Sequence, residues 1–243
     1  MRKLAIIGYG QMGKLVDELA GDYGFEIVSR IDPQKGTEVC AGDMNGAEIA
    51  IEFTEPGAAV NNIRKCLELG IKVVCGTTGW NDKLEEIIKE VTKHKGALVY
   101  GSNFSPGMNL FYKIVESAAE IMNHSEDYDV YGYELHHRHK KDSPSGTAKQ
   151  LAQILLSKLK NKEQVVYECL ERKRTDKEIH FASVRGGEIP GEHIIGFDSA
   201  FDSIELKHVA RNRKGLAAGA LQAAWFLLSR QGCYNFRDIL GEL

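Results

Sequence analysis

The feature that most constrains the fold is a glycine motif directly after the first apolar segment. Gly8, Gly10 and Gly13 have the GxGxxG spacing, between a strand-like run at 4–7 and a helix-like run at 12–19. Glycines placed there let the chain turn sharply and let its backbone approach a pyrophosphate, which the N–H groups at the helix start then bind. The motif predicts a dinucleotide-binding βα unit; a tight turn in another kind of α/β protein is the alternative.

The N-terminal part of the chain alternates between short strand-like and longer helix-like stretches. The strand-like stretches are apolar and rich in β-branched residues, which is typical of strands buried on both faces of a parallel sheet. Strands are predicted over 4–7, 25–31, 49–53, 73–75 and 97–100, and helices over 12–19, 58–69 and 84–91. This alternation predicts a Rossmann-like, doubly wound α/β domain.

The pattern changes after Asn103. Residues 108–122 and 147–159 have the apolar periodicity of amphipathic helices, and residues 128–135 alternate as a tyrosine-rich strand. Further strands are predicted over 179–185, 193–197 and 204–209, followed by an apolar helix over 216–228 that can cross back to cover the first domain. This order predicts a second, α+β domain with a mixed or antiparallel sheet.

Composition and charge exclude several classes of protein. The hydrophobic fraction of 43% and the charged fraction of 27% fit a compact globular protein. The net charge of −3, without a basic tail, gives no indication of nucleic-acid binding. The five cysteines include no CxxC pair, which suits reduced thiols in the cytoplasm. No apolar run reaches the roughly 20 residues of a membrane span, and no signal peptide is predicted.

Candidate cofactor contacts follow the ends of the predicted parallel strands. Asp32 stands close to the roughly 20-residue distance past the last glycine at which a carboxylate binds the adenosine ribose. An acid there favours NADH by repelling a 2′-phosphate, but Arg30 and Lys35 lie nearby, so the choice between NADH and NADPH stays open. Two glycine-containing segments, 76–79 and 101–105, end later strands in the same way, and each is equally compatible with a simple turn.

A basic segment near the middle of the chain carries the strongest indication of chemistry. The run His136-His137-Arg138-His139-Lys140-Lys141 ends a predicted strand, and Pro144 and Ser145 then provide signals for a helix start. The N–H groups of Gly146 and Thr147 would point outward as an anion receptor. Together the cationic loop and the helix start predict a site for carboxylates.

Two other interpretations of this segment stay open. His136, His137 and His139 could bind zinc, although the charges of Arg138 and Lys140 would repel a cation. The segment could also be a solvated basic loop without a chemical role.

The whole chain resembles the dihydrodipicolinate reductase family, also called the 4-hydroxy-tetrahydrodipicolinate reductases. The segment from Glu134 to Ala148 matches the signature of that family. Further matches occur in order along the chain: the glycine loop, Phe53-Thr54, Gly76-Thr77-Thr78-Gly79, Ser102-Asn103-Phe104-Ser105, Arg185-Gly186-Gly187 and Gly191-Glu192-His193.

This resemblance implies a domain organisation and an activity. A dinucleotide-binding domain would cover 1–106, completed by 214–243, and a substrate-binding and oligomerisation domain would cover 107–213. Four copies of the chain would form a homotetramer through the sheet of the second domain. The implied activity is the reduction of 4-hydroxy-tetrahydrodipicolinate, a small dicarboxylate, with NADH or NADPH in the diaminopimelate pathway of lysine biosynthesis.

The resemblance also implies roles for individual residues. His136 corresponds to the catalytic histidine and Lys140 to the proton donor, although the residues themselves leave open which of the two gives the proton. His137, Gly146 and Thr147 would hold the substrate carboxylates, and no metal is implied. The implied cofactor contacts are Gly8, Tyr9, Gly10, Gln11, Met12, Gly13, Asp32, Phe53, Gly76, Thr77, Thr78, Gly101, Ser102, Asn103 and Phe104.

Two functions of other classes remain as alternatives. A dehydrogenase for another amino-acid intermediate would act on a hydroxy or amino acid with an oxidised cofactor. A non-enzymatic redox sensor would bind a dinucleotide without turnover, but it would leave the cluster of histidine and lysine side chains unexplained.

Overall fold

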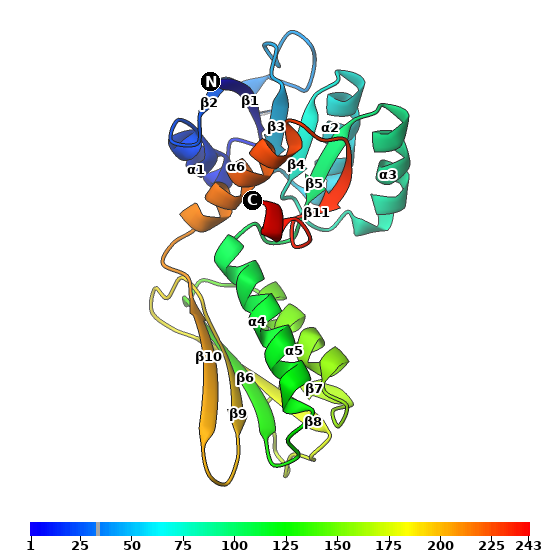
Figure 1. Cartoon of the computed structure of the whole chain (residues 1–243). Coiled ribbons are helices and arrows are strands. Elements are labelled where there is room, and N and C mark those ends of the chain that lie inside the picture. Colours follow the sequence, from blue (N-terminus) through cyan, green and yellow to red (C-terminus); the bar gives the residue numbers. More distant parts are fainter. Residues whose placement is uncertain (33–34) are drawn as a thin grey trace. The chain divides into compact units, whose positions relative to one another are not determined.

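The computed structural model describes residues 1–32 and 35–243, which form two compact units (Figure 1). One unit contains Met1–Asn109 together with Arg213–Leu243, and the other contains Leu110–Asn212. Each unit combines one β-sheet with helices, so the predicted α/β class is confirmed.

The first unit is built on a six-stranded parallel sheet. Its strands are β1 (Arg2–Ile7), β2 (Phe25–Ile31), β3 (Ile49–Glu52), β4 (Lys72–Cys75), β5 (Ala97–Tyr100) and β11 (Gly232–Asn235). They lie in the order β11-β5-β4-β3-β1-β2, with parallel pairings throughout. The direction of winding reverses between β1 and β3, and ligands of such open sheets bind beyond the carboxyl ends of the strands at this point.

Helices cover both faces of this sheet, as the doubly wound prediction requires. They are α1 (Gln11–Ala20), α2 (Pro56–Glu68), α3 (Leu84–Lys93) and α6 (Lys214–Leu227), with short 3-10 helices η2 (Asn81–Lys83) and η3 (Leu240–Glu242). In β1, Leu4 and Ile6 join one apolar cluster with α1 and α6, whereas Ala5 and Ile7 join a second cluster with α2 and α3. The alternation of side chains along a strand thus divides the core into two layers.

Gly219 allows α6 to pack directly against the segment after β5. A Cβ added at Gly219 would overlap the carbonyl oxygen of Phe104. We expect Gly219→Ala to lower the free energy of unfolding by about 1–3 kcal/mol, because overpacking forces the helix away from the core. Gly215→Ala in the same helix is the matched control, since its added Cβ would lie 3.8 Å from the nearest atom, Oγ of Ser105. Urea unfolding followed by circular dichroism measures both, and equal effects would contradict this packing.

The second unit contains a mixed five-stranded sheet, in agreement with the prediction. Its strands β6 (Asp129–His136), β7 (Gln164–Val166), β8 (Glu178–Arg185), β9 (Glu192–Asp198) and β10 (Ser203–Val209) lie in the order β10-β9-β6-β8-β7. β8 pairs parallel with β6 and β7, whereas β9 pairs antiparallel with β6 and β10. The helices α4 (Pro106–Met122) and α5 (Gly146–Lys158) lie on one side of this sheet (Figure 1).

Strand β6 carries the first residues of the segment from Glu134 to Ala148. Its residues alternate between half-buried and buried positions, and Val130, Gly132, Glu134 and His136 are on the buried side. Two charged or titratable side chains therefore stand in line with apolar core positions at the end of this strand.

Two short edge strands, β7 and β11, were not predicted. Their residues are half-buried or exposed, so they lack the apolar pattern that indicates a strand. Among the described residues, no helix combines the length and the apolar character needed to cross a bilayer.

Candidate active site

The glycine loop closes tightly where β1 and β3 end. Gly8 has a φ of 92°, and a Cβ added there would overlap the carbonyl oxygen of Phe53. A Cβ on Gly13 would overlap the carbonyl oxygen of Gly8. A Cβ on Gly10, in contrast, would meet no described heavy atom within 4 Å, and none of the described side chains caps the start of α1 there. The loop is therefore tightly packed at Gly8 and Gly13 but open at Gly10, where α1 starts, and such an open helix start suits an anionic ligand.

Two cavities adjoin this loop in the first unit. The larger, of about 750 Å³, is lined by residues that include Gly8, Tyr9, Gly10 and Asp32. The smaller, of about 390 Å³, is lined by Gly10, Gln11, Met12, Phe53, Thr54, Pro56, Gly76, Thr77 and Thr78. Ligand sites commonly have volumes of this order. The structure thus brings together most of the residues that sequence analysis assigned to cofactor binding, and they come from the ends of four strands.

The remaining segment assigned to the cofactor has a different environment. Gly101, Ser102, Asn103 and Phe104 are not among the residues that line these two cavities. The Phe104 ring is 2% exposed and packs against Phe53 and Phe236. Its side chain is therefore part of the core, so Phe104 can contact the cofactor only through its backbone.

Charged side chains surround Tyr9 beside the larger cavity. Asp17 accepts hydrogen bonds from the Tyr9 hydroxyl and from Arg30, whose Nε and Nη2 lie 2.6 and 2.8 Å from the carboxylate. The bond from Arg30 is the main cause that lowers the pKa of Asp17. Lys35 lies 3.9 Å from the Asp32 carboxylate. An acid and a cation therefore meet where the adenosine ribose is expected, which leaves NADH and NADPH both compatible.

In the second unit, the buried carboxylate of Glu134 is the centre of a polar network. Its Oε1 accepts hydrogen bonds from the Ser145 amide at 2.9 Å, the Ser183 hydroxyl at 2.9 Å and Arg185 Nη2 at 2.7 Å. Its Oε2 accepts one from the Ser145 hydroxyl and lies 3.3 Å from Nε2 of His193. The strand register explains this set, because Glu134 is directly opposite Ser183 on β8 and His193 on β9.

These contacts fix the charge of Glu134. Burial by itself raises the pKa of this carboxyl group, but hydrogen bonds from His193, Ser145 and Arg185 outweigh burial and hold the pKa far below its usual range. Glu134 is therefore ionised at neutral pH.

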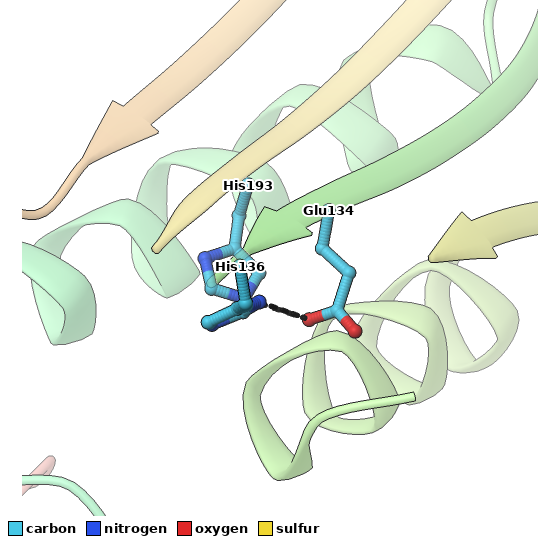
Figure 2. A group of neighbouring side chains, drawn as sticks. All are labelled: Glu134, His136 and His193. Atoms are coloured by element: carbon cyan, nitrogen blue, oxygen red, sulfur yellow. Dashed lines mark ion pairs between the residues drawn. The ribbon is translucent and has the colours of Figure 1, made fainter. Parts of the chain in front are cut away.

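His136 lies beside this carboxylate on the same side of β6. Its Nδ1 is 3.3 Å from Oε2 of Glu134, and its ring meets the His193 ring edge-on at 5.1 Å between centroids (Figure 2). Burial lowers the pKa of His136 to about 4; Glu134 opposes this effect, and the charges of His193, Lys140 and Arg185 add to it. The imidazole is therefore neutral at neutral pH.

The loop after β6 separates its cations into two groups. Nζ of Lys140 lies 2.7 Å from Asp142, whose carbonyl oxygen accepts a hydrogen bond from Arg185 at 2.9 Å. Arg138 and His139 are exposed and lie 3.0 and 3.7 Å from Glu188. Lys140 is thereby tied to the network around Glu134, whereas the other two side chains point to a different partner.

The helix start after this loop agrees with the prediction. Ser145 is the N-cap of α5, and its hydroxyl accepts a hydrogen bond from the Ala148 amide at 3.0 Å. The first residues of the helix are Gly146, which is exposed, and Thr147, which is half-buried. The first N–H groups of a helix have no partner within the helix, so these two are placed to bind an anion.

The zinc interpretation based on three histidines is not supported by the geometry. Within the described ranges, the side chains close enough to share a cation are Glu134, His136 and His193. A metal ion in that group would be repelled by Arg185, which already holds the carboxylate at 2.7 Å. The site instead has the features of a hydrogen-bonded network.

Sequence reasoning missed Glu134, Ser183, Arg185 and His193 as site residues. One signal was available, because Glu134 occupies an inward position of an alternating strand, and a buried carboxylate requires partners. The identity of those partners depends on the pairing of β6 with β8 and β9.

The low pKa of His136 predicts a pH dependence of stability. An unfolded histidine titrates near 6.5 and this folded one near 4, so unfolding takes up a proton between these values. The contribution of His136 is therefore fully present above pH 6.5 and is lost as the pH falls toward 4. Urea unfolding across this range should show a smaller loss of stability for His136→Asn than for the unchanged protein. Parallel pH curves would contradict the assignment.

The chain matches known proteins over almost its whole length. The family model described as "Dihydrodipicolinate reductase, N-terminus" matches residues 2–104, and the model described as "Dihydrodipicolinate reductase, C-terminus" matches residues 107–240. A 4-hydroxy-tetrahydrodipicolinate reductase of Christiangramia forsetii is 38% identical over 99% of this chain and 98% of its own length. The reductase of the same name from Methanoculleus marisnigri is also 38% identical, over 95% and 93%.

Solved structures show the same fold. A dipicolinate-bound dihydrodipicolinate reductase from Paenisporosarcina sp. has a TM-score of 0.78 at 20% identity and covers 98% of this chain and 99% of its own. An amine dehydrogenase from Mycobacterium smegmatis has a TM-score of 0.60 at 13% identity, covering 98% and 95%, so the fold alone does not determine an activity. The two family models and the relatives show instead that this chain belongs to the dihydrodipicolinate reductase family.

Proposed function

We propose that the protein reduces 4-hydroxy-tetrahydrodipicolinate, by way of dihydrodipicolinate, to tetrahydrodipicolinate with loss of water. The reaction would use NADH or NADPH and serve the diaminopimelate pathway of lysine biosynthesis. The observation that carries the proposal is the network in the second unit. There a neutral histidine and a helix start contact one buried carboxylate, and Arg185 connects this carboxylate to Asp142, which binds Lys140.

The first unit supplies the residues for the cofactor. The overlap that any side chain would cause at Gly8 and Gly13, and the open position at Gly10, fit a pyrophosphate beside the start of α1. Asp32 would bind the adenosine ribose. The bound cofactor supplies a hydride to C4 of the substrate ring. The nicotinamide end would contact Phe53, Gly76, Thr77 and Thr78, and also Gly101, Ser102, Asn103 and the backbone of Phe104.

The second unit supplies the residues for the substrate. The N–H groups of Gly146 and Thr147, with His137, would bind the ring carboxylates. Lys140 would deliver the proton to C3, because the low pKa of His136 leaves that ring neutral, and therefore a poor acid, at neutral pH. His136 would then bind and orient the ring as a neutral hydrogen-bonding group.

We further propose a homotetramer that assembles through the second sheet. The side of that sheet opposite Glu134 carries the stacked rings of Tyr131 and Tyr133, and Val184 and Val209, which are 50% and 49% exposed. By strand register the same side also carries Glu205, Lys207 and Glu192, and a surface on which aromatic and apolar side chains stand among charged ones is compatible with an interface. Analytical ultracentrifugation tests this assembly. A cytoplasmic location is supported by the five cysteines, all of which are free.

Binding experiments separate this function from the two alternatives. Isothermal titration calorimetry with reduced cofactor, and then with pyridine-2,6-dicarboxylate as a planar analogue of the substrate, should show saturable binding of both. A redox sensor would bind the cofactor without the dicarboxylate. A dehydrogenase for another intermediate would instead bind a hydroxy or amino acid with the oxidised cofactor.

A further inference from the structure

We propose that Glu134 is a positioning residue that links the two halves of the substrate site. Its carboxylate holds one tautomer of His136 and, through Ser145, fixes the helix start that binds the substrate carboxylates. The inference rests on the proposed function for its kinetic part, but the tautomer of His136 can be measured without turnover.

The first step concerns the capacity of the carboxylate. An ionised carboxylate has about four positions that accept hydrogen bonds. Ser145 donates twice, Ser183 and Arg185 donate once each, and His193 and His136 lie 3.3 Å from Oε2. The Ser145 amide and Arg185 can only donate, and both bind Oε1 of Glu134, so a proton on this oxygen would point at a donor. Glu134 is thus a fixed anion and not an acid or base.

The second step concerns the catalytic histidine. Nδ1 of His136 is buried and has no hydrogen-bond partner among the described residues, although the Glu134 carboxylate lies 3.3 Å away (Figure 2). Hydrogen bonds of catalytic groups are often long in the free enzyme and tighten when substrate binds. A neighbouring anion stabilises a proton on Nδ1, which leaves the lone pair on Nε2.

Nε2 of His136 lies next to Gly191. A Cβ added at Gly191 would lie 3.0 Å from Nε2, so a side chain at this position would crowd the edge of the ring that carries the lone pair. The edge that faces the carboxylate therefore carries the proton, and the opposite edge can accept a hydrogen bond from substrate or from Lys140.

The third step concerns the helix start. The amide and the hydroxyl of Ser145 both donate to Glu134, and the same hydroxyl accepts the Ala148 amide of α5. Ser145 thus attaches the first turn of α5 to the carboxylate beside His136. A single side chain thereby sets the distance between the group that orients the ring and the N–H groups that bind its carboxylates.

The tautomer is tested first in the unchanged protein. Nitrogen-15 NMR of protein labelled at histidine, with the His136 signals assigned by their loss in His136→Gln, distinguishes the two neutral tautomers. Between pH 6 and 8 we expect a protonated Nδ1 and an unprotonated Nε2. A proton on Nε2, or an imidazolium ion, would overturn the proposal even if the protein is an active reductase.

Variants test the link between the two halves. Glu134→Gln places an amide N–H₂ against donors, so we expect kcat to fall about a hundredfold and the Kd for pyridine-2,6-dicarboxylate to rise about tenfold. Ser145→Ala should raise that Kd by a similar factor while kcat changes less than about threefold, because His136 keeps its carboxylate.

The matched control is Glu178→Gln. Glu178 is also a buried carboxylate of this sheet, 1% exposed and bonded to Arg172, Gln164 and Thr175, but it starts β8 whereas Arg185 ends it, roughly 20 Å away at about 3.3 Å per residue. We expect it to lose comparable stability with kcat and Kd nearly unchanged. Equal kinetic effects of Glu134→Gln and Glu178→Gln would reduce Glu134 to a structural role. Absence of turnover in the unchanged protein would instead contradict the proposed function and leave the tautomer result valid.

Discussion

Replacement of Lys140 by methionine is expected to lower kcat about a thousandfold while KM changes only a few-fold. Methionine keeps the unbranched side chain up to the position of Cε but has no proton to give, and proton transfer by a positioned side chain commonly contributes 10²- to 10⁴-fold. His136 cannot compensate, because its low pKa leaves it neutral at the pH of the assay. Steady-state kinetics with reduced cofactor in excess measures the effect.

The adjacent Lys141 provides a matched control. It is exposed, whereas Lys140 is half-buried and lies 2.7 Å from Asp142. Lys141→Met removes the same charge from the same loop, so we expect kcat within about twofold of the unchanged protein. If Lys140→Met retained full kcat, the proton would have to come from another group, and the assignment of Lys140 would be wrong.

Replacement of Gly10 by alanine is expected to weaken binding of the reduced cofactor about a hundredfold with little change in thermal stability. The backbone at Gly10 has a φ of −79° that alanine adopts readily, and the added Cβ would meet no described heavy atom within 4 Å. The methyl group would therefore occupy the space in which the pyrophosphate is proposed to lie. A hundredfold loss of affinity corresponds to about 2.8 kcal/mol.

Substitutions at two other glycines serve as a control and as a comparison for this experiment. Gly21→Ala, at the opposite end of α1, is a matched control with a φ of −60° and equally open surroundings, and it should leave the Kd unchanged. Gly13→Ala should lower stability as well as affinity, because its Cβ would overlap the carbonyl oxygen of Gly8. Calorimetry and thermal unfolding separate these cases. Unchanged cofactor affinity in Gly10→Ala would contradict the placement of the pyrophosphate.

Features that depend on neighbouring residues could be predicted from the sequence. The alternation over 128–135 identifies β6, because side chains of a strand alternate between its two faces. The start of α5 could be placed at Ser145 because N-capping is a contact within one turn. The loop at Gly8 is also local, since it needs only a strand, a turn and a helix in succession.

The network around Glu134 could not be predicted in the same way. Ser183 and Arg185 are 49 and 51 residues away in the sequence, and they reach the carboxylate only because β8 pairs with β6. Strand order and register depend on the packing of the whole unit. The same reasoning explains why the geometry does not support a zinc site made of the three neighbouring histidines: His136 is buried on β6, whereas His139 is an exposed loop residue beside Glu188. Proximity in the sequence did not correspond to proximity in space.

The most direct test of the proposed function is a turnover assay. Purified protein would be mixed with the fresh product of dihydrodipicolinate synthase and with NADH or NADPH, and the loss of the near-ultraviolet absorbance of the reduced nicotinamide would be followed. We predict oxidation that requires both this protein and the synthase product, with the ratio of the two rates reporting the influence of Asp32 and Lys35. No oxidation with either cofactor, by folded protein that binds one of them, would contradict the reductase function.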